Sequence, residues 1–247
     1  MKQPFRQNRF FRRSPLAGHS LVQILIYVNL GLFTLMVLHG TVLGLGMGAI
    51  LNPPTQLLRI WGAQFWPFTV NYDQWWRCIS YAYTHGGIIH LGFNMMVLYQ
   101  IGPLLEEEIG WSRLFTIYTL CALTATLAGY IWHPMVTVVG ASGSIFGLIG
   151  FSVSYYHRMG GQLAHQRRNF MFQWAVLAFV FGLMVGADNA AHLGGALTGA
   201  AMGFAIPTTA RNLRRTDRFF KVLGWCCGLI TAVSLLFILI SGVTAGL

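Results

Sequence analysis

Long stretches without a single charged residue recur along the chain and constrain its fold more than any other feature. They span 20–58, 78–105, 114–157, 169–187, 189–210 and 222–247. Only 9% of the 247 residues are charged and 55% are hydrophobic, whereas about a quarter of the residues are charged in a typical soluble domain. A helix that crosses a bilayer needs about 20 mostly apolar residues. We therefore expect an all-α membrane protein.

The uncharged stretches divide into seven expected membrane crossings. The 114–157 run is too long for one crossing, and it is interrupted at Pro134, which cannot continue a helix. The first apolar segment exceeds the roughly 7–15 residues of a signal-peptide core, so we expect it to be retained as a helix. The crossings are expected near 21–45, 88–105, 112–131, 141–157, 170–186, 190–206 and 222–244.

Basic residues gather in the connections on one side of these crossings. Of the 16 Lys and Arg residues, all except Arg59 and Arg77 precede the first crossing or lie between crossings two and three, four and five, or six and seven. Cytoplasmic connections of membrane proteins carry this excess of positive charge. The net charge of +10 therefore predicts a cytoplasmic N-terminus in a plasma membrane of the bacterial inner-membrane type. It predicts the lipid bilayer, and not nucleic acid, as a partner.

Three of the expected crossings carry polar side chains at their outer ends. His85, His90 and Asn94 lie at the start of the second crossing, Ser142 starts the fourth, and His192 is in the first turn of the sixth. All three crossings run inward, so these groups share one depth, where polar residues are costly and mark functional sites. A Ser–His hydrogen bond at that depth would activate the hydroxyl as a nucleophile.

Glycine stripes accompany two of these polar groups. Small residues at four-residue spacing allow membrane helices to approach closely, which a Ser–His contact between two helices requires. Taken singly, such stripes indicate only packing, and a lone membrane Ser bonds its own helix carbonyl more often than it reacts. Their combination at one depth favours nucleophilic catalysis. The stripes are Gly143, Gly147 and Gly150 beside Ser142, and Gly195, Gly199 and Gly203 after His192.

Four motifs resemble those of the rhomboid family of intramembrane serine proteases. They are WR (76–77), HGGIIHLGFN (85–94), GASG (140–143) and AHLGGALTG (191–199). The resemblance covers about 70–206 and implies a rhomboid-like six-helix bundle, to which the last crossing adds a seventh C-terminal transmembrane helix. We divide the chain into a basic cytoplasmic N-terminus (1–20), a six-helix catalytic core (21–210) with an external loop (46–87), and a basic loop with the additional helix (211–247).

The resemblance also implies a catalytic dyad without a carboxylate. Ser142 would be the nucleophile and His192 the general base, and Asp188 is assigned no role. The oxyanion would be held by the Ser142 N–H, the Asn94 amide and the His90 side chain. The substrates implied are transmembrane proteins, cut near the external ends of their membrane segments. No cofactor and no metal are implied.

Four further residues are expected to support this dyad. Gly140 and Gly143 would let a substrate backbone approach the Ser142 hydroxyl. Phe146 stands where the family often has Tyr, stacked on the catalytic histidine, so that a hydroxyl contact is lost here. His85 is expected to have a structural role more than a chemical one.

Other classes of membrane protein fit the sequence less well. An aspartyl protease would need two acids at membrane depth, and a zinc protease would need His-Glu-x-x-His; neither pattern occurs. A transporter built on internal repeats is disfavoured, because no repeat is visible. The alternative that stays open is a catalytically inactive rhomboid-like protein that binds or sorts membrane proteins, although such relatives usually lack the Ser or the His.

Overall fold

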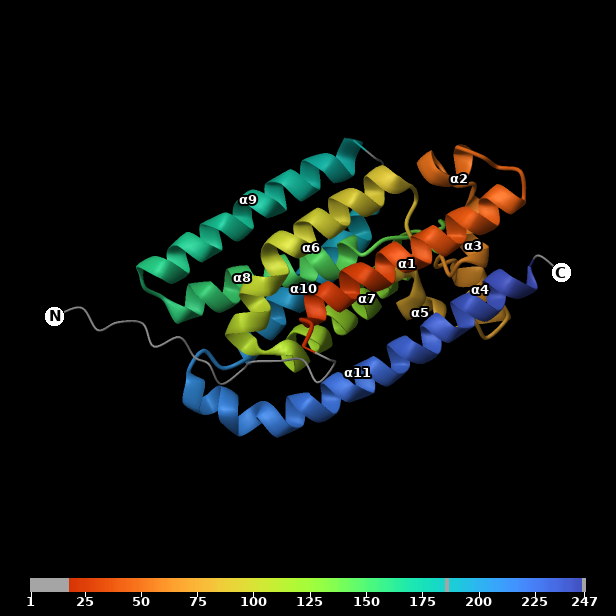
Figure 1. The fold of residues 1–247 in the computed structure, drawn as a ribbon. Helices are drawn as coiled ribbons and strands as arrows, with labels where there is room; N and C mark the ends of the chain where they lie inside the picture. Colours follow the sequence, from red (N-terminus) through yellow and green to blue (C-terminus); the bar gives the residue numbers. More distant parts are fainter. Residues whose placement is uncertain (1–17, 185–186, 246–247) are drawn as a thin grey trace.

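The computed structural model describes residues 18–184 and 187–245, and within these ranges it has eleven α-helices and no named strand (Figure 1). The basic residues Lys2, Arg6, Arg9, Arg12 and Arg13 of the expected cytoplasmic N-terminus lie outside the described residues. The expected all-α membrane bundle is confirmed.

Seven of the helices are long, and a group of short ones occupies the expected external loop. The long helices are α1 (Leu21–Val42), α6 (Ile88–Ile109), α7 (Trp111–Trp132), α8 (Ser142–Met159), α9 (Gln162–Met184), α10 (Asn189–Ala205) and α11 (Ala210–Thr244). The short ones are α2 (Gly48–Leu51), α3 (Thr55–Ile60), α4 (Trp66–Asn71), α5 (Arg77–Ser80) and a 3-10 turn, η2 (Tyr81–Tyr83).

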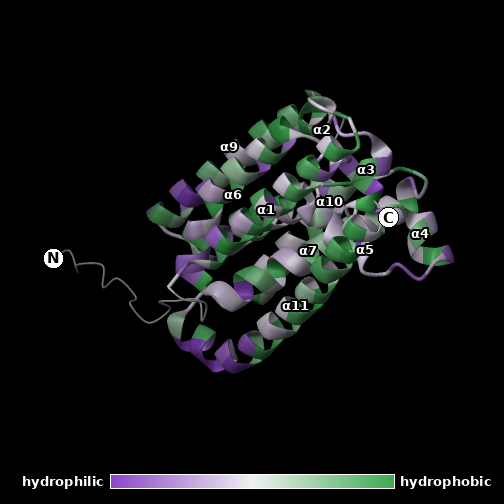
Figure 2. Ribbon diagram, turned by 45° about the vertical axis from the view of Figure 1, so that its right-hand side comes forward, coloured by the Kyte–Doolittle hydropathy of each residue, from purple (hydrophilic) through white to green (hydrophobic). Residues whose placement is uncertain are grey.

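Four helices of the described ranges are long and apolar enough to cross a membrane, namely α1, α6, α7 and α11. Apolar residues are frequent along α1 and α11 (Figure 2), whereas α7 lies inside the bundle, with 61% of its most apolar window buried. The other three expected crossings correspond to α8, α9 and α10. Of these, α10 has only 17 residues, and α8 buries serines together with its apolar residues. Their polarity is accommodated because they pack against other helices, where buried hydroxyls find partners.

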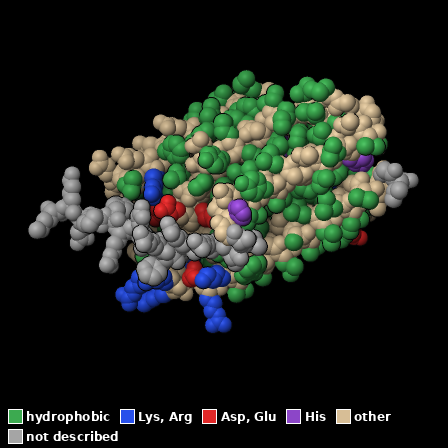
Figure 3. All heavy atoms as spheres, viewed as in Figure 1, with side chains coloured by type: hydrophobic (Ala, Val, Ile, Leu, Met, Phe, Trp, Pro, Cys, Tyr) green, Lys and Arg blue, Asp and Glu red, His purple; other side chains and the backbone are tan. Residues whose placement is uncertain are grey.

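Two helices begin earlier than the sequence predicts. α9 begins at Gln162 and not near 170, and α11 begins at Ala210, so the basic segment expected as a loop is helical. Arg and Lys are good helix formers, and Lys221 pairs with Asp217 one turn away at 2.8 Å. The side chains of Lys and Arg gather at the end of the molecule where α11 begins (Figure 3).

The centre of the bundle is the contact between α8 and α10, which we call the glycine seam. A Cβ atom added at Gly195 would lie 2.0 Å from the Gly143 carbonyl oxygen, and one at Gly199 would lie 1.8 Å from the Gly147 carbonyl oxygen. These distances are far below any van der Waals contact, so only glycine fits. The predicted close approach of the two helices is confirmed.

Buried ionic groups attach two outer helices to this centre. The Glu106 carboxylate at the end of α6 accepts hydrogen bonds from the Leu21 and Val22 N–H groups at 2.8 and 3.1 Å, where a helix start lacks internal acceptors. Arg113 of α7 is fully buried and donates to the Leu213 carbonyl at 2.5 Å. It also reaches Asp217 of α11 at 3.4 Å.

Candidate active site

A tight turn brings the chain into α8 at Ser142. Gly140, two residues earlier, has φ +115°, a conformation that side chains other than hydrogen rarely allow. Its N–H donates to the Tyr81 carbonyl at 2.9 Å. A Cβ atom at Gly140 would lie 2.6 Å from Cε1 of His90, so this glycine also makes room for the imidazole ring.

The glycine seam brings the Ser142 hydroxyl and the His192 ring together. Nε2 of His192 lies 2.9 Å from Oγ of Ser142, within hydrogen-bond distance. The two side chains come from helices α8 and α10, and each is followed along its helix by the glycines of the seam. The approach of these helix backbones is what allows such short side chains to meet.

An aromatic ring fixes the plane of the imidazole. Phe146, one turn after Ser142, stacks on His192 with ring centroids 4.2 Å apart and 20° between the planes. His192 itself is buried, and its Nδ1 has no hydrogen-bond partner among residues 18–184 and 187–245. In the described part of the chain, therefore, packing and not a carboxylate orients this ring.

The remaining predicted residues lie on the α6 side of the site. His90 and Asn94 line a small cavity together with Ser142 and His192. The Asn94 amide donates to the backbone carbonyl of His90 at 2.9 Å, which leaves its second N–H for another acceptor. His85 is fully buried, and its ring meets the His90 ring edge-on at 5.3 Å.

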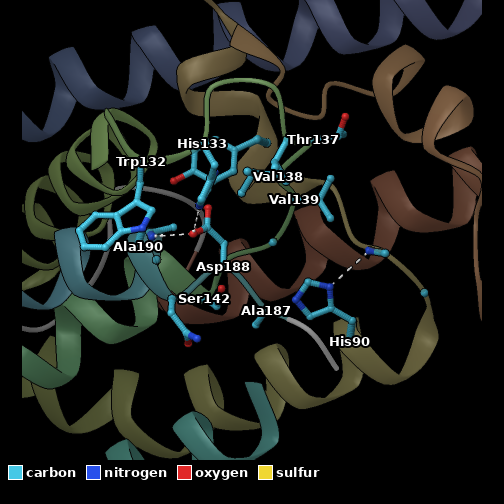
Figure 4. Close-up of a pocket in the computed structure, with 18 of the residues that line it drawn as sticks. His90, Trp132, His133, Thr137, Val138, Val139, Ser142, Ala187, Asp188 and Ala190 are labelled. Atoms are coloured by element: carbon cyan, nitrogen blue, oxygen red, sulfur yellow. Dashed lines mark hydrogen bonds and ion pairs between the residues drawn. The ribbon is translucent and has the colours of Figure 1, made fainter. Parts of the chain in front are cut away.

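A larger cavity of about 810 Å³ opens beside Ser142. It is lined by His90, Ser142 and Gly143, by residues 132–133 at the end of α7, by residues 136–140 before α8, and by residues 187–191 around the start of α10 (Figure 4). Ser142 and His90 line both this cavity and the smaller one. Ser142 thus borders a space large enough to hold water.

The sequence reasoning missed one pair of side chains at this cavity. Asp188 accepts from the Ala191 N–H at 3.0 Å and caps α10, and its carboxylate lies 2.8 Å from Nε2 of His133 at the end of α7 (Figure 4). An Asp immediately before a helix is a capping signal, which could have revealed the contact of Asp188 with the start of α10. No local sequence pattern indicates that His133, 55 residues away, is its partner.

No group of three or more His, Cys, Asp or Glu side chains placed to hold a metal ion occurs within 18–184 and 187–245. Cys78, Cys121 and Cys227 are buried free thiols, and Cys226 is an exposed one.

Comparison with known proteins identifies relatives of this arrangement. A family model described as the Rhomboid domain matches residues 72–209, more than half of the chain. RHOMBOID-like protein 2 of Arabidopsis thaliana is 29% identical over 208 residues, which are 80% of this chain and 64% of the relative. Rhomboid-like protease 3 of Toxoplasma gondii is 28% identical over 188 residues, 74% of this chain and 70% of the relative.

A third relative has its reaction type in its name. Rhomboid-type serine protease 2 of Emericella nidulans is 32% identical over 145 residues, 58% of this chain and 29% of the relative. The chain spans about half the length of most of these curated relatives, between 40% and 64% for four Arabidopsis proteins.

Proposed function

Because the chain belongs to the rhomboid family, we propose that it is an intramembrane serine endopeptidase with a Ser142–His192 dyad. The single observation that carries the proposal is the 2.9 Å contact between Oγ of Ser142 and Nε2 of His192. Nucleophilic catalysis by serine needs a base within this distance. The named serine-protease relative supports the same reaction class.

In the first step, Oγ of Ser142 attacks the carbonyl carbon of the substrate and His192 Nε2 takes the hydroxyl proton. The tetrahedral intermediate then expels the amine, which receives that proton from His192 as the peptide C–N bond breaks. Water from the cavity of about 810 Å³ hydrolyses the ester on Ser142, again with His192 as base. The products are a new carboxyl terminus and a new amino terminus.

Three donors would stabilise the oxyanion that forms in each step. The Ser142 N–H is at the first residue of α8, where a helix has no internal acceptor for it and its dipole is positive. The free Asn94 N–H and the His90 ring face the small cavity beside Ser142. Donors aimed at developing charge typically lower a barrier by about 3–4 kcal/mol each.

The substrates proposed are membrane-spanning proteins that enter sideways from lipid, past α9 and the 46–87 segment. A helix hides its carbonyls from a nucleophile, so the cut should fall where the substrate helix unwinds, with small residues at the cut and helix-breaking residues beyond it. The integral membrane location follows from the family and from the apolar helices. We further propose that the basic end of the bundle, where α11 begins, faces the cytoplasm.

The direct test uses purified protein and a labelled single-pass substrate in detergent. Ser142→Ala and His192→Ala should each reduce cleavage by at least about 1000-fold, because nucleophile and base act as a unit. Ser152→Ala is the matched control, since its hydroxyl only bonds the Leu148 carbonyl of its own helix at 2.6 Å. It should cleave at the wild-type rate.

Two outcomes would contradict the proposal. Cleavage that persists in folded Ser142→Ala would assign the reaction to another nucleophile. Wild-type protein that binds the substrate in a pull-down but leaves it uncut under all conditions would favour the inactive binding protein instead.

A further inference from the structure

Two buried or half-buried arginines lie close together at the end of the bundle opposite the basic end. Arg59 of α3 and Arg77 of α5 are the two cations that the sequence predicts on the outer side. Both guanidinium groups face the ring of Phe68, with their Cζ atoms 5.8 and 5.2 Å from its centroid. Arg77 is 3% exposed and Arg59 is half-buried.

Neither arginine has an acidic partner among the described residues. Arg77 donates to the carbonyls of Arg59 and Ala63 at 2.7 and 2.8 Å, and its Nε donates to Gln74 at 2.6 Å. Nε of Arg59 donates to the Thr137 hydroxyl at 2.9 Å. These bonds are to neutral oxygens, so two positive charges remain without a counter-charge in this part of the molecule.

The uncompensated charge disfavours the protonated form of Arg77. Burial, together with the positive charge of Arg59, lowers the pKa of Arg77 from 12.5 to about 10. Burial disfavours a charged group, and a like charge adds to that penalty. An anion between the two guanidinium groups would offset both effects.

A cavity of about 400 Å³ lies at this arginine pair and offers room for such an anion. Besides the two guanidinium groups it presents three neutral polar side chains and, on its other sides, two apolar ones. The neutral polar ones are Thr55, Gln56 and Ser241, and the apolar ones are Ile60 and Phe68. Hydroxyl and amide donors beside two arginines match the oxygens of a phosphate, which arginine binds in a bidentate manner.

The cavity lies where the apolar part of α11 meets the 46–87 segment. Gly62 packs against Ile238, and Gly242 packs against Trp61, so the last turns of α11 form one wall. Trp75, two residues before Arg77 in the sequence, is 57% exposed, as is typical of aromatic side chains at the level of lipid headgroups. A phosphate at this level would belong to a lipid whose chains follow the apolar surface of α11.

We propose that the cavity between α3, α5 and the end of α11 binds the phosphate group of a membrane phospholipid. The ligand would join the 46–87 segment, which borders the active-site cavity, to the seventh helix. The site is separate from Ser142 and His192, so it can be tested on a variant that is unable to cleave.

The test measures the unfolding temperature of the full chain carrying Ser142→Ala in detergent, with four additives at fixed ionic strength. These are dioctanoyl phosphatidylglycerol, dioctanoylglycerol, inorganic phosphate and sodium chloride. The phospholipid should raise the unfolding temperature by several degrees, because a ligand that binds only the folded state stabilises it. Dioctanoylglycerol, which has the same chains and no phosphate, should not.

Two variants connect this response to the arginine pair. In Arg59→Gln, at least about ten times more phospholipid should be needed for the same rise in unfolding temperature, since one of two charge-assisted pairs is lost. Gln56→Glu changes an exposed side chain at the rim of the cavity and should abolish the response by repelling the phosphate, without disturbing packing. Arg211→Gln, which removes the same charge at the other end of the molecule, should respond as the parent does.

The additives also distinguish the sources of the phosphate. A response to the phospholipid alone supports a lipid site, whereas an equal response to inorganic phosphate would support a site for free phosphate in place of the lipid. Equal stabilisation by dioctanoylglycerol, or an undiminished response in Gln56→Glu, would overturn the proposal.

Discussion

Two helix interfaces on either side of the candidate active site differ in kind. In the glycine seam between α8 and α10, backbone meets backbone, and an added Cβ at Gly150 would lie 2.2 Å from the Ala196 carbonyl oxygen. Between α6 and α9, side chains meet instead, and Phe93 stacks on Phe181 with centroids 3.8 Å apart. At these glycine contacts the first interface has no side chain that could move aside, whereas the second can open by rotation of two rings.

This difference indicates that one interface holds the site residues in place while the other can open. The rigid seam carries the two groups that must stay within hydrogen-bond distance, Ser142 and His192. The softer interface involves α9, much of whose length is exposed, including Phe172 and Val176 at 51% and 62%. A helix with few buried contacts opens at low free-energy cost, as lateral entry of a substrate would require.

Breaking the rigid interface should have the largest effect. In Gly199→Val the new side chain collides with the Gly147 carbonyl, so α8 and α10 must separate and the dyad with them. We expect cleavage to fall by more than about 100-fold, since a displacement of about 1 Å has that effect. The unfolding temperature should fall too.

The matched control for that change is Gly31→Val on α1, where nothing lies within 4 Å of an added Cβ. It should retain cleavage activity. Gly199→Val with a normal rate would show that the dyad does not depend on the seam.

A smaller loss of cleavage activity is expected when Asn94, which lies between the two interfaces, is changed. Asn94 projects from α6 toward the dyad, and Asn94→Ala removes one of three proposed oxyanion donors. The turnover number should fall by up to about 100-fold, while KM changes little because the donor acts in the transition state. Steady-state kinetics on a soluble-tailed substrate can separate the two constants. An unchanged turnover number would remove Asn94 from the oxyanion site.

Weakening the packing between α6 and α9 should have the smallest effect on the cleavage rate, and it should raise the rate instead of lowering it. Phe181→Ala deletes a stacked ring pair, which is typically worth about 0.5–1.5 kcal/mol. If opening limits the reaction, cleavage of a transmembrane substrate should rise about 2- to 10-fold, as a free-energy change of that size allows.

Phe172→Ala on the exposed face of the same helix is the control and should leave the rate unchanged. A slower Phe181→Ala enzyme, with the dyad intact, would mean that the ring pair shapes the site and does not close it.

The comparison also shows what the sequence could and could not predict. Depth and glycine spacing favoured a contact between Ser142 and His192, because both residues start inward-running helices with glycine faces, and the resemblance then implied their roles. The His133–Asp188 contact joins residues that share no helix, and no local pattern indicates it. The early start of α11 places the Leu213 carbonyl where buried Arg113, 100 residues away in the sequence, can donate to it.

The position of α11 has a consequence for how this protein could be handled. α11 and α9 lie on opposite sides of the bundle (Figures 1 and 2), and Arg113 holds the beginning of α11 while Trp61 and Gly62 hold its end. A second membrane protein could therefore pack along the exposed face of the seventh helix, which includes Val222, Trp225 and Leu229. The α9 side, where we propose that substrates enter, would stay clear.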